Sequence, residues 1–198
     1  MVGVEPPLPN ASSLTVHRLR VTLLDVSPPV WRTFVVPSAL PLSTLHGIVQ
    51  IVMGWENVHL HEWEVGGVIY ASPEEEDWGE EAADEAQVLL GEVATGHSSL
   101  VYRYDFGDGW EHLVAVDAVE PYDARTAPLA CTGGARACPP EDCGGPSGYE
   151  HLLDALADPA DPEHDEMTLL YGDSIDPEAF DLARVNAALE AFVRDATS

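Results

Sequence analysis

The amino-acid sequence predicts an α+β fold in which an antiparallel sheet is packed by a central helix and by C-terminal helices. Two early segments alternate apolar and polar residues, the next repeats its apolar residues with a helical period, and later segments alternate again around a glycine-rich turn. Strands that follow one another as hairpins pair antiparallel, and helices then pack on a face of the sheet. The ββα opening resembles a β-grasp arrangement.

The N-terminal elements are two predicted strands. Residues 1–13 show no regular period, and we interpret them as a flexible leader. Residues 14–25 and 30–37 alternate and are rich in β-branched side chains, which favours strands. The prolines of Ser27–Pro29 predict the turn between them.

A helix is predicted next. Ser43 is placed to cap it, and Gly54 is placed to end it because glycine readily adopts the left-handed conformation. Trp55 is expected to close over the core. The apolar stripe of this helix consists of Leu45, Ile48, Val49 and Val52.

The middle of the chain predicts two hairpins separated by an acidic loop. Residues 59–65 and 68–72 form the first hairpin, and residues 100–106 and 110–119 form the second. Residues 74–85 carry eight acidic side chains in twelve positions, so we interpret them as a solvated loop and not as a site.

The C-terminal part is predicted to be helical. Residues 121–146 are rich in cysteine, proline and glycine and predict a long irregular loop. Ser147 and Glu150 form a capping box for one helix, and Asp181 is placed to start the last helix. Without a repeat or a linker, residues 14–198 predict a single domain.

The chain is strongly acidic, with 35 acidic and 8 basic residues, no lysine and a formal net charge of −27. Nucleic-acid affinity depends on lysine and arginine neutralising phosphates, so direct nucleic-acid binding is disfavoured. The charge is typical of a protein adapted to a salty cytoplasm, or of one that binds a basic protein partner.

The sequence also predicts a cytoplasmic protein. No apolar run approaches the ~20 residues that a membrane helix requires, and the N-terminus resembles no secretion signal. The three cysteines form an odd set within thirteen residues, which favours a reducing compartment over a disulfide framework.

The stretch YRYDFGDGWEH, residues 102–112, is the first candidate site. Asp105, Asp108 and His112 flank the tip of the predicted hairpin, and carboxylates with an imidazole suit acid–base or metal chemistry. A structural alternative explains the same composition, because the glycines at 107 and 109 supply positive φ and Asp108 tolerates a turn.

His59 and His61 share one face of a predicted strand, so they are further candidates if that strand lies beside the hairpin. The alternative is a partly buried polar face beside Trp63.

A second candidate site is a structural zinc site in the cysteine loop. Thiolates and imidazole are preferred zinc ligands, and a metal would order a loop of this composition. The fourth ligand is open, because Glu141 or Asp142 could replace His151, and buried free thiols are the alternative to zinc. The predicted ligands are Cys131, Cys138, Cys143 and His151.

Four segments together resemble the plasmid pRiA4b ORF-3-like family: VSPPVWRTFVVP, LSTLHGIVQIVMGWENVHLHEW, YRYDFGDGWEH and ACPPEDCGGPSGYEHLL. The resemblance runs from about Leu19 to the C-terminal helix. It implies a link to plasmids and to insertion elements that carry such genes as passengers. It supplies no catalytic residues that could be carried over to this chain.

The sequence thus leaves three functions open. The first is a binding or adaptor module, linked to plasmids or mobile elements, whose surface is the hairpin tip and the cysteine loop. The alternative is a metal-dependent hydrolase that uses Asp105, Asp108 and His112. The third is an accessory protein that binds a basic nucleic-acid-binding partner through its acidic surface.

Overall fold

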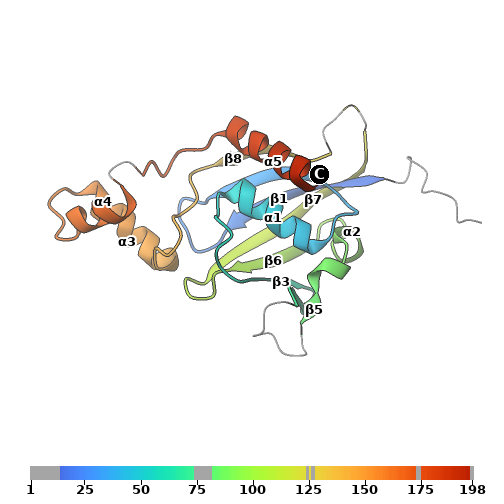
Figure 1. Ribbon diagram of the computed structural model, residues 1–198, viewed down its shortest axis with the longest axis horizontal. Coiled ribbons are helices and arrows are strands. Elements are labelled where there is room, and N and C mark those ends of the chain that lie inside the picture. The colour runs from blue at the N-terminus through green and yellow to red at the C-terminus, as the bar shows by residue number, and fades with distance from the viewer. Residues whose placement is uncertain (1–13, 74–81, 124, 126–127, 173–174, 197–198) are drawn as a thin grey trace, which may run out of the picture.

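The computed structural model shows an α+β fold built on one eight-stranded sheet (Figure 1). The strands follow the order β5-β4-β3-β6-β7-β1-β2-β8, and all neighbours pair antiparallel except β4 and β5. The predicted α+β class and its antiparallel sheet are therefore confirmed, whereas the β-grasp likeness and the single-domain assignment stay predictions. The described residues are 14–73, 82–123, 125, 128–172 and 175–196.

The six predicted strands are found close to their expected bounds, and two further strands lie in segments that were predicted to be loops. The bounds of all eight are β1 (Thr15–Leu23), β2 (Trp31–Pro37), β3 (His61–Val65), β4 (Val68–Ala71), β5 (Ala83–Asp84), β6 (Ser99–Tyr104), β7 (Trp110–Pro121) and β8 (Ala130–Ala135). The two strands that were not predicted are β5 and β8. Strand β1 lies between β2 and β7, and alternate residues of all three are buried on one face. The alternation read from the sequence thus marks the core face of the sheet.

Helix α1 (Leu42–Met53) buries the predicted apolar stripe against that face. Gly54 ends it with a φ of 109°, as expected. The predicted Ser43 cap is wrong, because the helix begins directly after Pro41 without a side-chain cap. The backbone N–H of Leu42 instead donates to the carbonyl of Val88, 3.0 Å away, so a distant segment replaces the local cap.

Helix α5 (Leu182–Ala196) lies beside α1 over the same face, as Figure 1 shows. Asp181 starts it as predicted, since its Oδ1 accepts from the backbone N–H of Arg184 at 3.0 Å. Asn186 joins the helix to β8 by accepting from the N–H of Cys131 and donating to the carbonyl of the same residue.

Helices α3 (Gly145–Ala157) and α4 (His164–Tyr171) lie beyond one end of the sheet (Figure 1). The predicted Ser147–Glu150 capping box is wrong, because α3 begins at Gly145 with Gly144 at its N-cap. A Cβ at Gly145 would lie 2.2 Å from the carbonyl oxygen of Asp108. The helix therefore starts where a glycine lets its backbone touch the hairpin.

Two predicted loops are more ordered than the sequence suggests. The loop expected over 121–146 contains β8, whose small residues pair with β2 and complete the sheet. The acidic loop contains β5 near its end, and a 3-10 turn (Glu85–Gln87) and helix α2 (Leu90–Val93) follow it. Glu85 is only 4% exposed, which corrects the solvated-loop interpretation at that end. Residues 74–81 and the expected leader 1–13 lie outside the described residues.

None of the described helices is long and apolar enough to cross a membrane.

Candidate functional site: the hairpin tip and an adjoining pocket

The turn between β6 and β7 is organised by Asp105. Its φ is 54°, its carbonyl accepts from the N–H of Gly109 at 2.6 Å, and its Oδ1 accepts from the N–H groups of Gly107 and Asp108. Gly109 has the expected positive φ of 70°, whereas Asp105, and not Gly107, supplies the other left-handed residue. Aspartate tolerates this conformation because its short side chain bonds nearby backbone groups.

Asp108 connects this turn to the start of α3. Its Oδ2 accepts from the N–H of Gly144 at 3.0 Å, so its carboxylate satisfies a backbone donor at the helix N-terminus. Asp105 and Asp108 thus both lie at the tip, where their carboxylates accept structural hydrogen bonds, and their catalytic role stays a prediction.

His112 lies in the core behind the tip and is fully buried. Its Nε2 accepts from the indole N–H of Trp55 at 3.1 Å, and its Nδ1 donates to the carbonyl of Tyr102 at 3.2 Å. Burial lowers the pKa of His112 to about 4, so the ring is neutral at pH 7. Both ring nitrogens are engaged within the core, and neither bonds Asp105 or Asp108. Its catalytic role stays a prediction.

The two histidines beside the hairpin have different partners. Strand β3 pairs with β6, as the hypothesis required. His61 is buried, stacks on His46 with ring centroids 3.5 Å apart, and contacts Glu85 through Nε2 at 3.0 Å. His59 precedes the strand and faces Asp105, whose Oδ2 lies 3.6 Å from its Nε2. Neither histidine is bonded to His112.

The cysteine loop shows no preassembled group of the predicted ligands. Burial raises the pKa of all three thiols, that of Cys143 to about 12. His151 is exposed and bonded to Glu163. Among the described residues, the group whose ligand atoms lie within 4.8 Å of one another consists of His59, Asp105 and Asp142. The zinc site of Cys131, Cys138, Cys143 and His151 stays a prediction.

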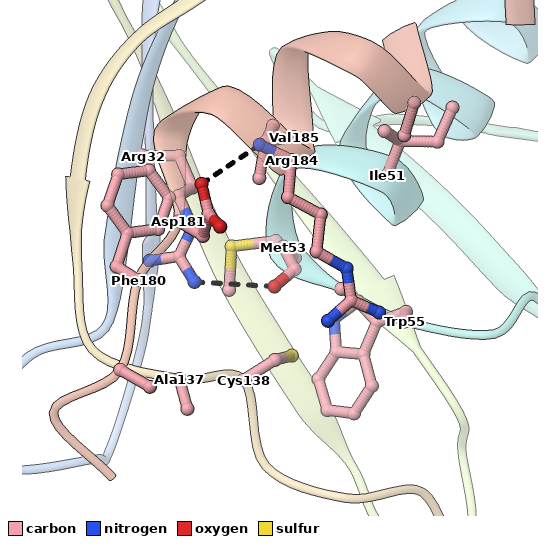
Figure 2. A pocket seen from close by; sticks show the side chains of 13 residues that line it. Arg32, Ile51, Met53, Trp55, Ala137, Cys138, Phe180, Asp181, Arg184 and Val185 are labelled. Carbon is pink, nitrogen blue, oxygen red and sulfur yellow. Dashed lines mark hydrogen bonds between the residues drawn. The ribbon is translucent and has the colours of Figure 1, made fainter. Parts of the chain in front are cut away.

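A pocket of about 710 Å³ opens between the end of α1, the start of α5 and residues 137–138 of the loop. Its walls are mainly apolar and include Met53, Trp55 and Phe180. Figure 2 shows the long side chain of Arg184 extending from α5 towards Trp55. No feature of the sequence identified this pocket, because its walls come from four separate segments of the chain that lie between Arg32 and Ala188.

Arg32 forms the inner wall of the pocket and is 2% exposed. Its guanidinium donates to the carbonyls of Val52, Ala135 and Arg136 at 2.7–2.8 Å, and the ring of Phe180 covers it at 4.4 Å. The Val52 carbonyl lies in the last turn of α1, where the helix dipole is negative. Backbone carbonyls and a helix terminus therefore balance this buried charge, and no carboxylate pairs with it within the described residues.

The fold and these positions can be compared with known proteins. Residues 15–184 match the family model for plasmid pRiA4b ORF-3-like protein. This chain belongs to that family. The matched range includes the hairpin, the loop and most of the pocket, so the resemblance read from the four segments is confirmed.

Two relatives share most of the length of this family member. The uncharacterized protein y4hQ of Sinorhizobium fredii (strain NBRC 101917 / NGR234) is 43% identical over 181 residues, which cover 89% of this chain and 91% of y4hQ. The crystal structure of MM3350 from Methanosarcina mazei Go1, a protein of unknown function, is similar with a TM-score of 0.79 and 33% identity. The structural match covers 86% of this chain and 97% of MM3350.

Proposed function

We propose that this family member is a binding module whose pocket takes a small molecule with an anionic group on an apolar body. The observation that carries the proposal is Arg184. It lines an apolar pocket, and none of the described ion pairs includes it. A cation in that position is available to an anionic ligand in a chain whose net charge is −27.

The size and walls of the pocket suit a small molecule. Ligand pockets have volumes of about 300–1,000 Å³ and combine apolar walls with a few polar groups. This pocket has about 710 Å³ and presents the indole of Trp55 and the side chain of Met53. An aromatic or aliphatic body would be removed from water against these side chains, which supplies the apolar part of the affinity.

The charged groups of the pocket favour an anion. Two of the eight basic residues of the chain, Arg32 and Arg184, line it. The one carboxylate in the lining, Asp181, already accepts from the backbone N–H of Arg184. The donors of Arg32 are used by carbonyls, so Arg184 is the group that would bond the ligand and Arg32 would act through its charge.

The test is a fluorescence titration with anilinonaphthalene sulfonate, an aromatic anion. We expect saturable binding to one site, with displacement by decanoate and not by decyltrimethylammonium. Arg184→Glu should weaken binding about 10- to 100-fold, because a hydrogen bond to a charged group contributes about 1.5–3 kcal/mol. Ala188→Trp should fill the pocket and abolish binding, since Ala188 lines it.

The matched control is Arg18→Glu, which makes the same charge change at an exposed residue of β1 outside the pocket. Its affinity for the dye should equal that of the wild type, and all variants should keep the wild-type melting temperature. Equal losses in Arg184→Glu and Arg18→Glu would mean that net charge alone attracts the dye, and the pocket would not be the site.

The adaptor role, the mobile-element link and the hydrolase activity are supported by fewer observations than the pocket. The family description supports the link to plasmids, and the net charge of −27 supports a basic protein partner for an adaptor. The hydrolase alternative is supported by Asp105, whose Oδ2 faces His59, whereas His112 is engaged with Trp55 and Tyr102. The adaptor role, the mobile-element link and the hydrolase stay predictions.

A further inference from the structure

Three carboxylates from two segments surround the imidazole of His59 near the hairpin tip. Its Nε2 lies 3.2 Å from Oδ1 of Asp142, 3.6 Å from Oδ2 of Asp105 and 3.8 Å from Oε2 of Glu141. His59 precedes β3, Asp105 follows β6, and the other two precede α3. The fold thus assembles one nitrogen and three oxygens from chain segments that are distant in sequence.

These contacts are not hydrogen bonds. The Nε2 of His59 and the Oε2 of Glu141 are buried atoms without a hydrogen-bond partner. The side chain of Asp105 is 9% exposed, and none of the hydrogen bonds between described residues uses its Oδ2. Buried polar atoms in native proteins are nearly always satisfied, so two buried unsatisfied atoms that face one another, with the unbonded Oδ2 of Asp105 beside them, indicate a missing partner.

Asp105 and Glu141 are the two most buried of these carboxylates. In each, one oxygen accepts hydrogen bonds from the protein, and the second oxygen faces His59. Oδ1 of Asp105 accepts from two backbone N–H groups of the turn. Oε1 of Glu141 accepts from the N–H of Glu56 at 2.7 Å and from the hydroxyl of Tyr104 at 3.0 Å. Supporting hydrogen bonds of this kind orient the ligands of metal sites.

We propose that His59, Asp105 and Asp142, with Glu141, bind a divalent first-row transition-metal ion. A hydrogen bond places its acceptor about 2.9 Å from the nitrogen, along the N–H direction. A metal ion instead occupies that direction at about 2.0–2.1 Å and holds the other ligand atoms off the axis, about 3.0–3.4 Å from the nitrogen. None of the three contacts has hydrogen-bond geometry, and the 3.2 Å separation of Asp142 falls within the range set by a metal ion. The separations of Asp105 and Glu141, 3.6 and 3.8 Å, are longer, so these two carboxylates would move towards the nitrogen when an ion binds.

The ligand types select the class of ion. Imidazole suits zinc and its neighbours in the first transition row, whereas magnesium and calcium prefer oxygen ligands alone. Asp142 is 77% exposed, so one side of the site is open to solvent and leaves room for a water or a substrate atom. Zinc should therefore bind more tightly than magnesium or calcium. The site shares no residue with the pocket, so the two proposals succeed or fail separately.

The experiment is isothermal titration calorimetry of the full chain with zinc chloride, after dialysis against chelator and then buffer. About 0.15 M sodium chloride screens the acidic surface, since the Debye length is then about 8 Å. The site variants are His59→Gln, Asp105→Asn and Asp142→Asn. Asp142 is exposed and asparagine also tolerates its φ of 55°, so Asp142→Asn keeps the fold.

We expect one zinc per chain and a loss of affinity of at least about 100-fold in His59→Gln, above the range for a supporting residue. The matched controls are His151→Gln, which removes an exposed histidine, and Cys138→Ser, which tests the cysteine loop. Both should bind zinc as the wild type does. Bound cobalt should show a visible spectrum without sulfur-to-metal charge transfer.

Three results would overturn the proposal. Zinc binding that survives in Asp142→Asn and His59→Gln would mean adventitious ions on the acidic surface. Binding lost in Cys138→Ser would place the metal in the cysteine loop. No saturable binding at millimolar zinc would mean that His59 is a buried histidine balanced by carboxylates.

Discussion

The start of α3 is fitted so closely to the hairpin that a single methyl group should disrupt it. Gly145→Ala adds a Cβ 2.2 Å from the carbonyl oxygen of Asp108, far inside van der Waals contact, at a φ of 70°. The positive φ alone costs about 1–2 kcal/mol for a residue with a side chain. Overpacking against backbone adds about 1–3 kcal/mol, so we expect the free energy of unfolding to fall by about 2–5 kcal/mol.

Gly109→Ala is the matched control, because Gly109 has the same φ of 70° and an added Cβ there meets nothing within 4 Å. It should lose only the cost of the positive φ, about 1–2 kcal/mol. Urea unfolding followed by circular dichroism measures both variants, and an unchanged slope with urea would show that only stability differs. Equal losses in the two variants would refute the close contact between Gly145 and Asp108.

Three further predictions concern the core and the open face of the sheet. Because burial lowers the pKa of His112 to about 4, the unfolded chain binds more protons below pH 6.5. Urea unfolding should therefore show stability falling from pH 6.5 to pH 4, by about 3 kcal/mol for this group, and falling less in His112→Gln. Trp55→Phe leaves the Nε2 of His112 without its donor and should cost about 1–3 kcal/mol, measured in the same way. Arg103→Met leaves Glu62, Glu64 and Glu111 without their shared cation, so it should destabilise the protein, and added sodium chloride should reduce the loss in thermal melts.

Elements that depend on local pattern were predictable from the sequence. The alternation in β1, β2, β6 and β7 reflects which side chains face the core. Successive side chains of a strand point to opposite faces, so this pattern can be read from each strand alone. The stripe of α1 follows in the same way from the helical period.

Elements that depend on distant partners were not predictable. The cap expected at Ser43 is replaced by a hydrogen bond from Leu42 to Val88, and the cap expected at Ser147 is displaced by the contact of Gly145 with Asp108. Strand β8 consists of small residues without alternation, and it is a strand because the edge of β2 is available.

The candidate site also contains residues that local pattern could predict and residues that only distant contacts bring together. Asp105 and Asp108 were placed at the tip because a hairpin brings its own turn residues together. Glu141 and Asp142 were considered only as zinc ligands of the cysteine loop, and the fold sets them beside His59 instead. The pocket at Arg184 gave no signal in the sequence beyond the scarcity of basic residues.

The strand order also has a consequence for synthesis on the ribosome. The hairpin of β1 and β2 is made early, but its two neighbours, β7 and β8, are made on the order of 100 residues later. At translation rates of about 5–20 residues per second, both edges of this hairpin stay open for about 5–20 seconds. Open edges are templates for aggregation. Most of the acidic residues made in that interval lie between β4 and β7. The negative charge of the nascent chain therefore grows before β7 and β8 cover the open edges, and like-charge repulsion between nascent chains opposes their aggregation.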